Sequence, residues 1–262
     1  MSIRFGPAGL GGVNESISNL EKYHELGLKA CEIAFTYGIY IKKKEDAKKI
    51  RETAKKLGIY LSIHAPYYIN LNSEDKEKIK KSKERILECL KVGTWLHAKK
   101  IIFHPGFYGK KTKEETYNKI KKEILDLQKE KKEKNYTPEL APETTGKINV
   151  FGSVDEIAQL VSNTGCSFCI DFAHILAREK NYLFDEVFKK FSKYKNIHIH
   201  FSGINYGEKG EKSHKKTPEE ELIKLIKNLP SNKEITIINE SPSPIEDSVA
   251  GLKIKEKNKL DN

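Results

Sequence analysis

The chain has 262 residues, of which 32% are charged and 37% hydrophobic, with a formal net charge of +11. Such a charge suits an anionic partner such as nucleic acid, although many lysine-rich proteins carry it only on solvated helix faces. No apolar run reaches the roughly 18 residues that a membrane span requires, so the sequence argues against an integral membrane protein.

Short β-rich runs alternate with helical patterns from end to end. We predict strands at residues 2–6, 30–35, 59–65, 99–104, 136–143, 167–172, 196–202 and 234–240. We predict helices at residues 14–26, 43–57, 74–97, 112–133, 153–163, 181–193, 217–228 and 244–256. Eight strand–helix repeats without a linker predict an α/β fold, a single (β/α)8 TIM barrel domain over residues 1–262. A doubly wound open sheet is the structural alternative.

Four cysteines are present: Cys31, Cys89, Cys166 and Cys169. With no signal peptide at the start of the chain, they favour a reducing, cytoplasmic location. Cys166 and Cys169 have the CxxC spacing of a zinc knuckle or a redox pair, but no second pair exists. The two fall on opposite faces of a predicted strand, so we interpret them as core residues.

Six of the predicted strands end alike, with a histidine or a carboxylate between an apolar run and a loop. Successive strand side chains point to opposite faces, so each polar residue lies opposite its apolar neighbours. In a closed parallel barrel these residues converge at the carboxyl-terminal mouth, where barrel enzymes carry their chemistry. They are His64, His104, Glu143, Asp171, His200 and Glu240. Imidazoles and carboxylates gathered at one point predict a metal site.

Two further histidines follow predicted strands. His174 comes three residues after Asp171, so the chain must already be turning there, and the two side chains are expected to serve neighbouring metals. His214 lies in a flexible loop after the seventh strand and can fold over the mouth. Together these eight candidates are too many for one tetrahedral zinc but suffice for two or three ions if a carboxylate bridges.

The remaining histidines have plainer interpretations. His24 and His97 fall on predicted helices and are expected at the surface. His198 shares a strand face with His200 but lies one layer deeper, which favours an interior histidine rather than a ligand.

The ordered blocks resemble the endonuclease IV family of zinc-dependent apurinic/apyrimidinic endonucleases. His64-Ala65-Pro66-Tyr67-Tyr68-Ile69-Asn70-Leu71 is similar to the family's His-x-x-Tyr-hydrophobic-Ile-Asn signature. The next three ligand blocks of the family are matched, in order, by His104-Pro105-Gly106, Pro142-Glu143-Thr144-Thr145-Gly146 and Cys169-Ile170-Asp171-Phe172-Ala173-His174. The resemblance covers most of the chain and implies a (β/α)8 fold.

The resemblance also implies a zinc cluster of two to three ions per chain, with Mn²⁺ as an alternative metal. By this resemblance, His64 and His104 would hold the first ion, and Glu143 would bridge it to the second. The second ion would be completed by Asp171, His200 and Glu240. The third would be held by His174 and His214. The implied activity is hydrolysis of damaged double-stranded DNA on the 5′ side of abasic sites, leaving a 3′-hydroxyl and a 5′-deoxyribose phosphate. The catalytic residue would be Glu143, beside the activated water, in a monomeric enzyme.

Two departures from the family pattern affect the third ion. The block usually written His-x-Asn-Asp/Glu reads His200-Phe201-Ser202-Gly203 here. The acid expected two residues before His214 is replaced by Lys212, which cannot bind a metal while protonated. Glu211 or Glu208 can substitute after a small loop shift, and we predict Glu211.

Tyr67 and Tyr68 directly follow a candidate ligand and are expected to wedge into the base stack of DNA. Packing beneath the loop is the alternative. The lysines at 42–44 and 110–111 follow strands and either touch phosphates or are simply solvated.

Two other function classes stay open. A sugar isomerase or epimerase on a related barrel also uses a His/Glu/Asp site, but with one divalent ion held by about four ligands. A metal-stabilised nucleic-acid-binding module without catalysis would explain the charge, but not a solvent-facing ring of bridging-competent ligands.

Overall fold

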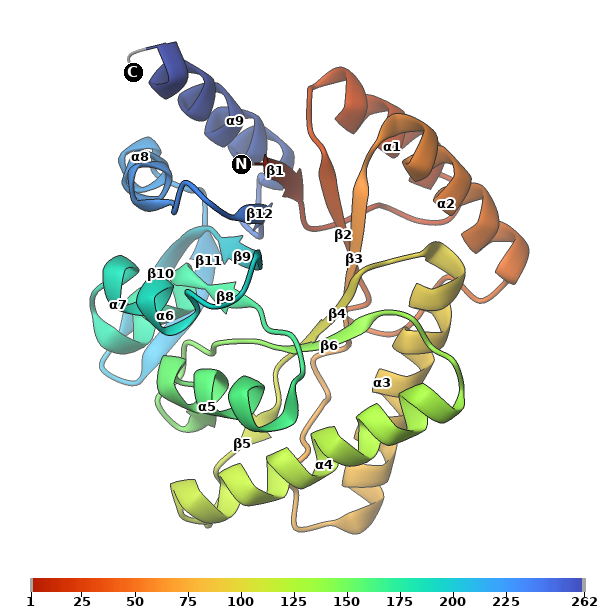
Figure 1. The fold of residues 1–262 in the computed structure, drawn as a ribbon, viewed down its shortest axis with the longest axis vertical. Helices are drawn as coiled ribbons and strands as arrows, with labels where there is room; N and C mark the ends of the chain where they lie inside the picture. The colour runs from red at the N-terminus through yellow and green to blue at the C-terminus, as the bar shows by residue number, and fades with distance from the viewer. Residues whose placement is uncertain (1, 261–262) are drawn as a thin grey trace.

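The computed structural model describes residues 2–260, with side chains described through Lys257. Within that range, eight parallel strands form the predicted α/β barrel, and helices surround it (Figure 1). The barrel strands are β1 (Ser2–Pro7), β2 (Ala30–Ala34), β3 (Tyr60–His64), β4 (Lys100–Phe103), β6 (Glu139–Pro142), β8 (Ile170–Asp171), β9 (Asn196–Phe201) and β12 (Glu234–Asn239). The (β/α)8 TIM barrel predicted from the sequence is therefore confirmed.

The barrel closes through two short contacts between two four-stranded sheets. The strand orders are β1-β12-β9-β8 and β2-β3-β4-β6. A parallel bridge between Ala8 and Glu32 joins β1 to β2, and one between Glu143 and Cys169 joins β6 to β8. This closure excludes the doubly wound open sheet.

The outer helices are amphipathic, with lysine and glutamate facing solvent. In α2, for example, Ala47, Ile50 and Ala54 are buried. Capping boxes begin two of the helices, one from Thr112 with Glu115 and one from Ser153 with Glu156. Six helices match the expected positions: α1 (Ser16–Glu25), α2 (Lys44–Leu57), α3 (Lys76–Leu96), α4 (Lys113–Glu133), α5 (Val154–Thr164) and α8 (Glu219–Asn228). The last helix is α9 (Pro244–Leu260), which packs against β1.

The helix predicted at 181–193 is wrong in its extent. The structure has α6 (Phe172–Glu179), which begins directly after β8, and a short α7 (Phe184–Lys190). Helix α6 starts early because the carboxylate of Asp171 accepts a hydrogen bond from the backbone N–H of His174, at 2.8 Å. Lys180 and Leu183 have left-handed backbone angles, which interrupt the helical path between the two segments.

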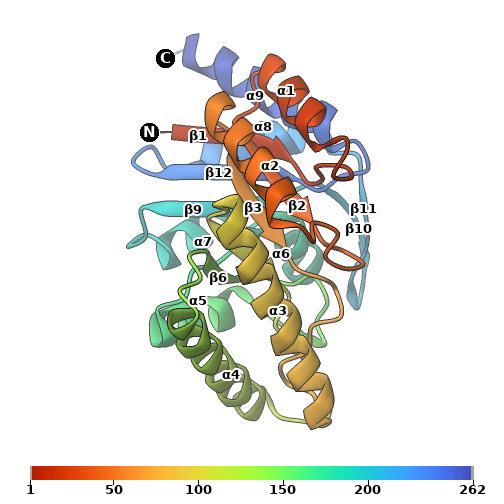
Figure 2. The ribbon, with the colours of Figure 1, turned by 90° about the vertical axis from the view of Figure 1, so that its right-hand side faces the viewer.

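Two small antiparallel sheets of two strands each lie beyond the carboxyl ends of the barrel strands. Strands β5 (Gly106–Phe107) and β7 (Val150–Phe151) pair antiparallel, and β10 (Gly203–Gly207) pairs with β11 (Gly210–Lys215). Figure 2 shows β10 and β11 at the opposite side of the barrel from the N-terminus. The segment around His214, predicted as a flexible loop, is thus a β-hairpin. The sequence did not predict it because its residues lack the alternation of apolar and polar side chains that is typical of strands.

All four cysteines are buried and free, in agreement with their interpretation as core residues. No helix among the described residues is both long and apolar enough to cross a membrane.

Candidate metal centre

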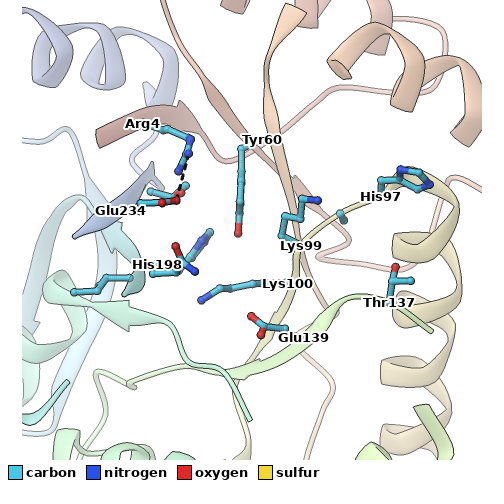
Figure 3. Close-up of a pocket in the computed structure, with 13 residues that line it drawn as sticks. Arg4, Tyr60, His97, Lys99, Lys100, Thr137, Glu139, His198 and Glu234 are labelled. Atoms are coloured by element: carbon cyan, nitrogen blue, oxygen red, sulfur yellow. Dashed lines mark ion pairs between the residues drawn. The ribbon is translucent and has the colours of Figure 1, made fainter. Parts of the chain in front are cut away.

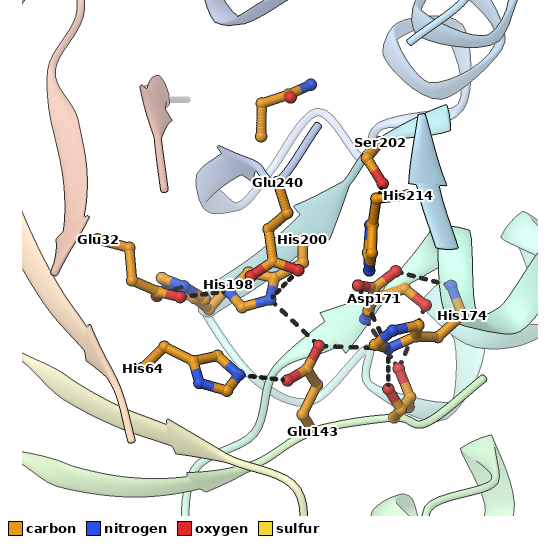
Figure 4. Close-up of polar contacts among 12 residues, drawn as sticks. Glu32, His64, Glu143, Asp171, His174, His198, His200, Ser202, His214 and Glu240 are labelled. Atoms are coloured by element: carbon orange, nitrogen blue, oxygen red, sulfur yellow. Dashed lines mark hydrogen bonds and ion pairs between the residues drawn. The ribbon is translucent and has the colours of Figure 1, made fainter. Parts of the chain in front are cut away.

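Glu143, at the end of β6, lies at the centre of the site and is fully buried (Figure 4). Its Oε2 lies 3.2 Å from Nε2 of His64 and 3.0 Å from Nε2 of His104. Its Oε1 lies 3.2 Å from Nδ1 of His200 and 3.4 Å from Nδ1 of His174. The two oxygens of one carboxylate therefore face two different sets of histidines.

The residues predicted from the sequence gather into three groups whose donor atoms lie within 4.8 Å of one another. These groups are His64, His104 and Glu143; then Glu143, Asp171, His200 and Glu240; then His174, Glu211 and His214. All nine candidates are thus brought together at the carboxyl-terminal mouth. Asp171 and His174 fall in different groups, as expected from the turn between them.

In two of the histidines, one ring nitrogen is held by a backbone carbonyl. Nδ1 of His64 lies 2.7 Å from the carbonyl oxygen of Ala65, and Nδ1 of His174 lies 2.9 Å from that of Thr144. A carbonyl oxygen only accepts hydrogen bonds, so Nδ1 carries the proton and leaves the Nε2 lone pair for the centre.

In two other histidines, a side chain lies beside one ring nitrogen. Nδ1 of His214 lies 2.6 Å from Oγ of Ser202. Nε2 of His200 lies 2.9 Å from Oε1 of Glu32, so here Nδ1 is the nitrogen that faces the centre. Ser202 belongs to the block that departs from the family pattern, and its contact gives it a role in orienting His214.

A β-bulge explains how Glu211 reaches the third group. Ile204 pairs with His214 and Tyr206 pairs with Glu211, with a register shift between the two pairs. Lys212 is the extra residue of this bulge. Residues three apart normally point to opposite faces of a strand, but the extra residue brings Glu211 and His214 to one face. The Oε2 of Glu211 lies 3.4 Å from Nε2 of His174.

Two glycines allow this hairpin to approach the centre. A Cβ on Gly146 would lie 2.7 Å from the Cβ of Glu211 and 3.0 Å from Cδ2 of His174. A Cβ on Gly210, whose φ is +93°, would lie 2.1 Å from the carbonyl oxygen of Gly146. The backbone N–H of Glu211 donates to that same carbonyl at 3.1 Å, which fixes the carboxylate over the mouth.

The electrostatics of the centre favour bound cations. Burial by itself raises the pKa of Glu143, yet His104 and His200 outweigh it and hold that pKa well below its usual range. Burial opposes protonation of His64, but hydrogen bonding and charge attraction from Glu143 raise its pKa to about 9. The pKa of His174 is likewise raised, because Asp171, Glu143 and Glu211 together outweigh its burial. Protons on the histidines thus balance the buried carboxylates when no metal is bound.

The donor set fits a zinc or manganese cluster. It combines imidazole nitrogens with carboxylate oxygens, the ligands that Zn²⁺ takes at about 2.0–2.2 Å and that Mn²⁺ also accepts. Oδ2 of Asp171 is buried without a hydrogen-bond partner among the described residues, although Nδ1 of His174 lies 3.3 Å away. A buried carboxylate oxygen left unpaired in this way is accounted for if a cation occupies the space that it faces.

Aromatic and apolar side chains surround the mouth. Of the eight exposed large hydrophobic residues among the described part of the chain, six lie in the segments that follow barrel strands, two of them on the short strands β5 and β10: Tyr37, Tyr67, Tyr68, Phe107, Ile148 and Tyr206. As whole residues, Tyr67 and Tyr68 are 57% and 56% exposed, so each is partly packed and partly accessible. Tyr67 packs against His64, with ring centroids 5.6 Å apart.

The candidate lysines near the mouth differ from one another. Lys42, Lys43, Lys44 and Lys110 are exposed. The Nζ of Lys111 instead donates to the side-chain oxygen of Asn72 at 3.1 Å and to its carbonyl at 3.2 Å. Lys111 therefore supports the loop after β3, whereas the other four are free to meet solvent or an anion.

One buried acid beneath the centre was missed. Glu32 on β2 is fully buried and contacts both His200 and His198, whose Nε2 lies 3.1 Å from Oε2 of Glu32. The signal was available, because Glu32 is a carboxylate inside the apolar run of β2.

His198 is buried and paired, as expected of an interior histidine, while His24 and His97 are exposed. Cys169 lies within 4.8 Å of His198 and His200, but burial raises the pKa of its thiol well above the usual range, so the thiol stays protonated.

The mouth encloses a cavity of about 350 Å³, lined by His64, His104, His174, His214, Glu211 and Glu240 together with Tyr67 and Phe107. A larger hollow of about 590 Å³ opens at the opposite end of the barrel, where Arg4, Tyr60, Lys100 and Glu139 line it (Figure 3). Of the residues in the candidate metal groups of the described chain, only His198 lines that hollow. Because the amino-terminal end of such barrels serves stability, we place the site at the mouth.

Comparison with curated proteins gives relatives of two kinds. The chain is 35% identical over 266 residues to Uncharacterized protein MJ0133 of Methanocaldococcus jannaschii, covering 95% of each. It is 32% identical over 122 residues to Probable endonuclease 4 of Carboxydothermus hydrogenoformans, covering 45% of this chain and 42% of that one. The endonuclease IV resemblance of the motif blocks is therefore supported by sequence similarity.

Solved structures match along the whole chain. SacUVDE aligns with a TM-score of 0.78 at 17% identity, covering 99% of both chains. Endonuclease IV from Thermus thermophilus aligns with a TM-score of 0.71 at 20% identity, covering 99% of this chain and 100% of that one. A D-psicose 3-epimerase from Clostridium cellulolyticum has a TM-score of 0.69 at 15% identity, covering 98% and 99%. At these identities the matches establish the fold alone.

Residues 20–243 match the family described as Xylose isomerase-like TIM barrel, which is most of the chain. This match agrees with the closed eight-stranded barrel and with the full-length structural alignments. The chain therefore belongs to the xylose isomerase-like TIM barrel family.

Proposed function

We propose that this protein is a metal-dependent endonuclease that hydrolyses damaged double-stranded DNA 5′ to abasic sites, giving 3′-hydroxyl and 5′-deoxyribose phosphate ends. The observation that carries the proposal is the position of Glu143, whose two oxygens face different sets of histidines. A carboxylate shared in this way suits a bridge between two ions. A sugar epimerase that uses one ion has no need of such a bridge.

Phosphodiester hydrolysis needs an activated water, neutralised phosphate oxygens and a stabilised leaving oxygen. Two to three Zn²⁺ ions, or Mn²⁺ in their place, would supply all three when bound, by lowering the pKa of water and offsetting negative charge. We assign the ligands to three ions as follows: His64, His104 and Glu143; Glu143, Asp171, His200 and Glu240; His174, Glu211 and His214.

The side chains around the mouth have definite protonation states. Glu143 stays ionised, because its pKa is held well below its usual range by His104 and His200 despite its burial, so it serves as a bridge and not as a proton donor. Burial, with the nearby Glu240, raises the pKa of the Tyr67 phenol to about 12. Tyr67 therefore keeps its proton at neutral pH and can donate a hydrogen bond to a substrate oxygen at the cavity wall.

The surface around the mouth suits unstacked DNA. Half-exposed Tyr67, Tyr68 and Phe107 offer ring faces to bases, while exposed lysines and the net charge of +11 favour phosphates. An abasic nucleotide leaves the helix at the lowest cost, because no base has to be unstacked. The relative named Probable endonuclease 4 supports an endonuclease activity.

The alternative is a one-ion sugar isomerase or epimerase. One observation favours it: Glu143, Asp171, His200 and Glu240 alone form a four-donor group, and epimerases share the fold. A one-ion enzyme would not use the other two groups of candidate ligands. These are the group of His64 and His104 and the group of His174, Glu211 and His214. Those extra histidines make the endonuclease the better-supported function.

The decisive experiment measures metal content and two activities on the same preparation. Protein purified without chelator should hold at least two zinc or manganese ions per chain by elemental analysis, and it should nick a duplex with one abasic site without added Mg²⁺. Prolonged zinc chelation should abolish nicking. One ion per chain, turnover of a ketose and no nicking would assign the protein to the epimerases.

A further inference from the structure

Glu32 is a buried carboxylate on β2 whose position is fixed by contacts from two other strands of the barrel. Its Oε2 accepts a hydrogen bond from Oγ of Ser62 on β3 at 2.7 Å and lies 3.1 Å from Nε2 of His198 on β9. All three residues are at most 1% exposed, so no solvent competes for these contacts. The carboxylate is therefore held firmly inside the barrel, one layer below the mouth.

The second oxygen of Glu32 faces a proposed metal ligand. Oε1 lies 2.9 Å from Nε2 of His200. Both atoms are buried, and neither makes a hydrogen bond of good geometry to any described residue, so this close approach is an ion-pair contact. The opposite nitrogen of the ring, Nδ1, lies 3.2 Å from Glu143 and 3.4 Å from Glu240.

We propose that Glu32 is a positioning residue of the metal centre, which keeps the proton of His200 on Nε2 and directs the Nδ1 lone pair at the second ion. The proposal rests on the proposed function insofar as His200 is taken to bind metal. A carboxylate only accepts hydrogen bonds, so it stabilises the ring form that is protonated on the nitrogen it faces.

Glu32 cannot itself replace His200 as a ligand of that ion. It lies on the far side of the His200 ring from Glu143, as Figure 4 shows, and its Oε2 is already occupied by Ser62 and His198. Its effect on the ion is therefore exerted through the imidazole. Partners of this kind typically change metal affinity by about 10- to 100-fold when removed.

The test is Glu32→Gln in the full-length chain, stripped of metal and titrated with Co²⁺, whose visible spectrum reports the ligand geometry. The amide has the same volume, but its NH₂ can face Nε2 and force the ring proton onto Nδ1, which blocks the ligand. We expect about a 10- to 100-fold weaker affinity for one of the bound ions, with a changed spectrum. Glu32→Asp, which keeps the charge but shortens the side chain, should recover part of the affinity.

The matched control is Glu123→Gln. Glu123 is also a buried glutamate, but it lies on α4 and pairs with Lys119 at 2.8 Å and Lys83 at 3.4 Å, away from the mouth. Its removal should leave Co²⁺ affinity and spectrum unchanged. A general loss of stability on removing a buried carboxylate would affect both variants, whereas a positioning role affects only Glu32→Gln.

Two results would overturn the proposal. The first is a folded Glu32→Gln variant with wild-type affinity and spectrum. If that variant does not fold, Ser62→Ala takes its place, because it removes the hydrogen bond to Oε2 of Glu32 while keeping the charge of the carboxylate. We then expect a severalfold loss of Co²⁺ affinity. Unchanged affinity in Ser62→Ala is the second overturning result. Metal binding without DNA cleavage would refute the proposed function alone, while a wild-type chain that binds no ion at the mouth would refute both.

Discussion

Replacement of Tyr68 by alanine tests whether the loop after β3 recognises unstacked DNA. Tyr68 is 56% exposed, and the guanidinium of Arg85 lies 5.8 Å from the centre of its ring. Stacking a base on an aromatic ring contributes about 1–3 kcal/mol, and because Tyr68 is only partly exposed we take the lower end, about 1 kcal/mol. Tyr68→Ala should then weaken binding of abasic duplex by about 5-fold.

Tyr67 is expected to contribute similarly, with one complication. Its ring lies 5.6 Å from that of His64 and 6.2 Å from that of His104, so its loss also removes packing from two proposed ligands. The double alanine variant should bind more than ten-fold more weakly, since two contributions of about 1 kcal/mol each correspond to roughly 30-fold. Metal content should stay unchanged, because His64 and His104 keep their contacts with Glu143 in the absence of the phenols.

The assay is fluorescence anisotropy with a labelled duplex carrying one stable abasic analogue, at a single fixed salt concentration because phosphate contacts depend strongly on salt. Tyr68→Phe should bind like wild type, since stacking requires the ring and not the hydroxyl. Leu125→Ala removes an exposed apolar side chain on α4 and should have no effect. Wild-type affinity in the double variant would show that the tyrosines only pack the loop.

Three further predictions concern the centre and the cysteines. Glu143→Gln should nearly abolish nicking, measured on abasic duplex, because it removes the charge that two histidine sets share; retention of more than about a tenth of the wild-type rate would contradict the bridge. Glu211→Ala should lower the zinc content, measured by elemental analysis, by one ion per chain. Deletion of Lys212 should keep that ion, because Glu211 and His214 then share a strand face without a bulge. Loss of the ion on deletion of Lys212, with the ion retained in Glu211→Ala, would be incompatible with this geometry. Burial raises the pKa of Cys166 to about 11, so its alkylation at pH 8 should be slow and should accelerate as the pH approaches 11, which mass spectrometry can follow; rapid labelling at pH 8 would instead indicate a reactive CxxC pair.

The barrel and its ring of polar residues were predictable because they depend on strand periodicity. Each of His64, His104 and Glu143 stands at or just beyond the end of an apolar run, and parallel strands bring such positions to one mouth. The register of β9 with β12 places His200 beside Ile238 at the same level of the barrel, which leaves Glu240 just beyond it. Local pattern and global topology agree here, so the sequence was sufficient.

The elements that sequence periodicity missed depend on single contacts. Helix α6 starts immediately after β8 because Asp171 caps it, although the same residue was assigned to a strand end as a ligand. The bulge at Lys212 carries no apolar pattern and is fixed by the close approach of Gly210 to Gly146, two segments far apart in the sequence. Such features arise from tertiary packing, which propensity and periodicity do not encode.

Glu32 was overlooked for a different reason. A lone acid in a buried strand has no partner that the sequence can identify, because Ser62 and His198 come from other strands. Charged residues are seldom fully buried unless paired, so its position in the apolar run of β2 was itself evidence of a partner. The observation becomes informative only once the register of neighbouring strands is known.

The contacts of Glu143 distinguish the two candidate functions further. If one ion alone occupied the group of Glu143, Asp171, His200 and Glu240, then His64 and His104 would contact Oε2 of Glu143 without holding an ion themselves. In a cluster, His64 and His104 would hold a second ion, and the same carboxylate would serve both. The position of His64 and His104 on one oxygen of Glu143 is therefore the feature that a one-ion epimerase leaves unexplained and a phosphodiesterase requires.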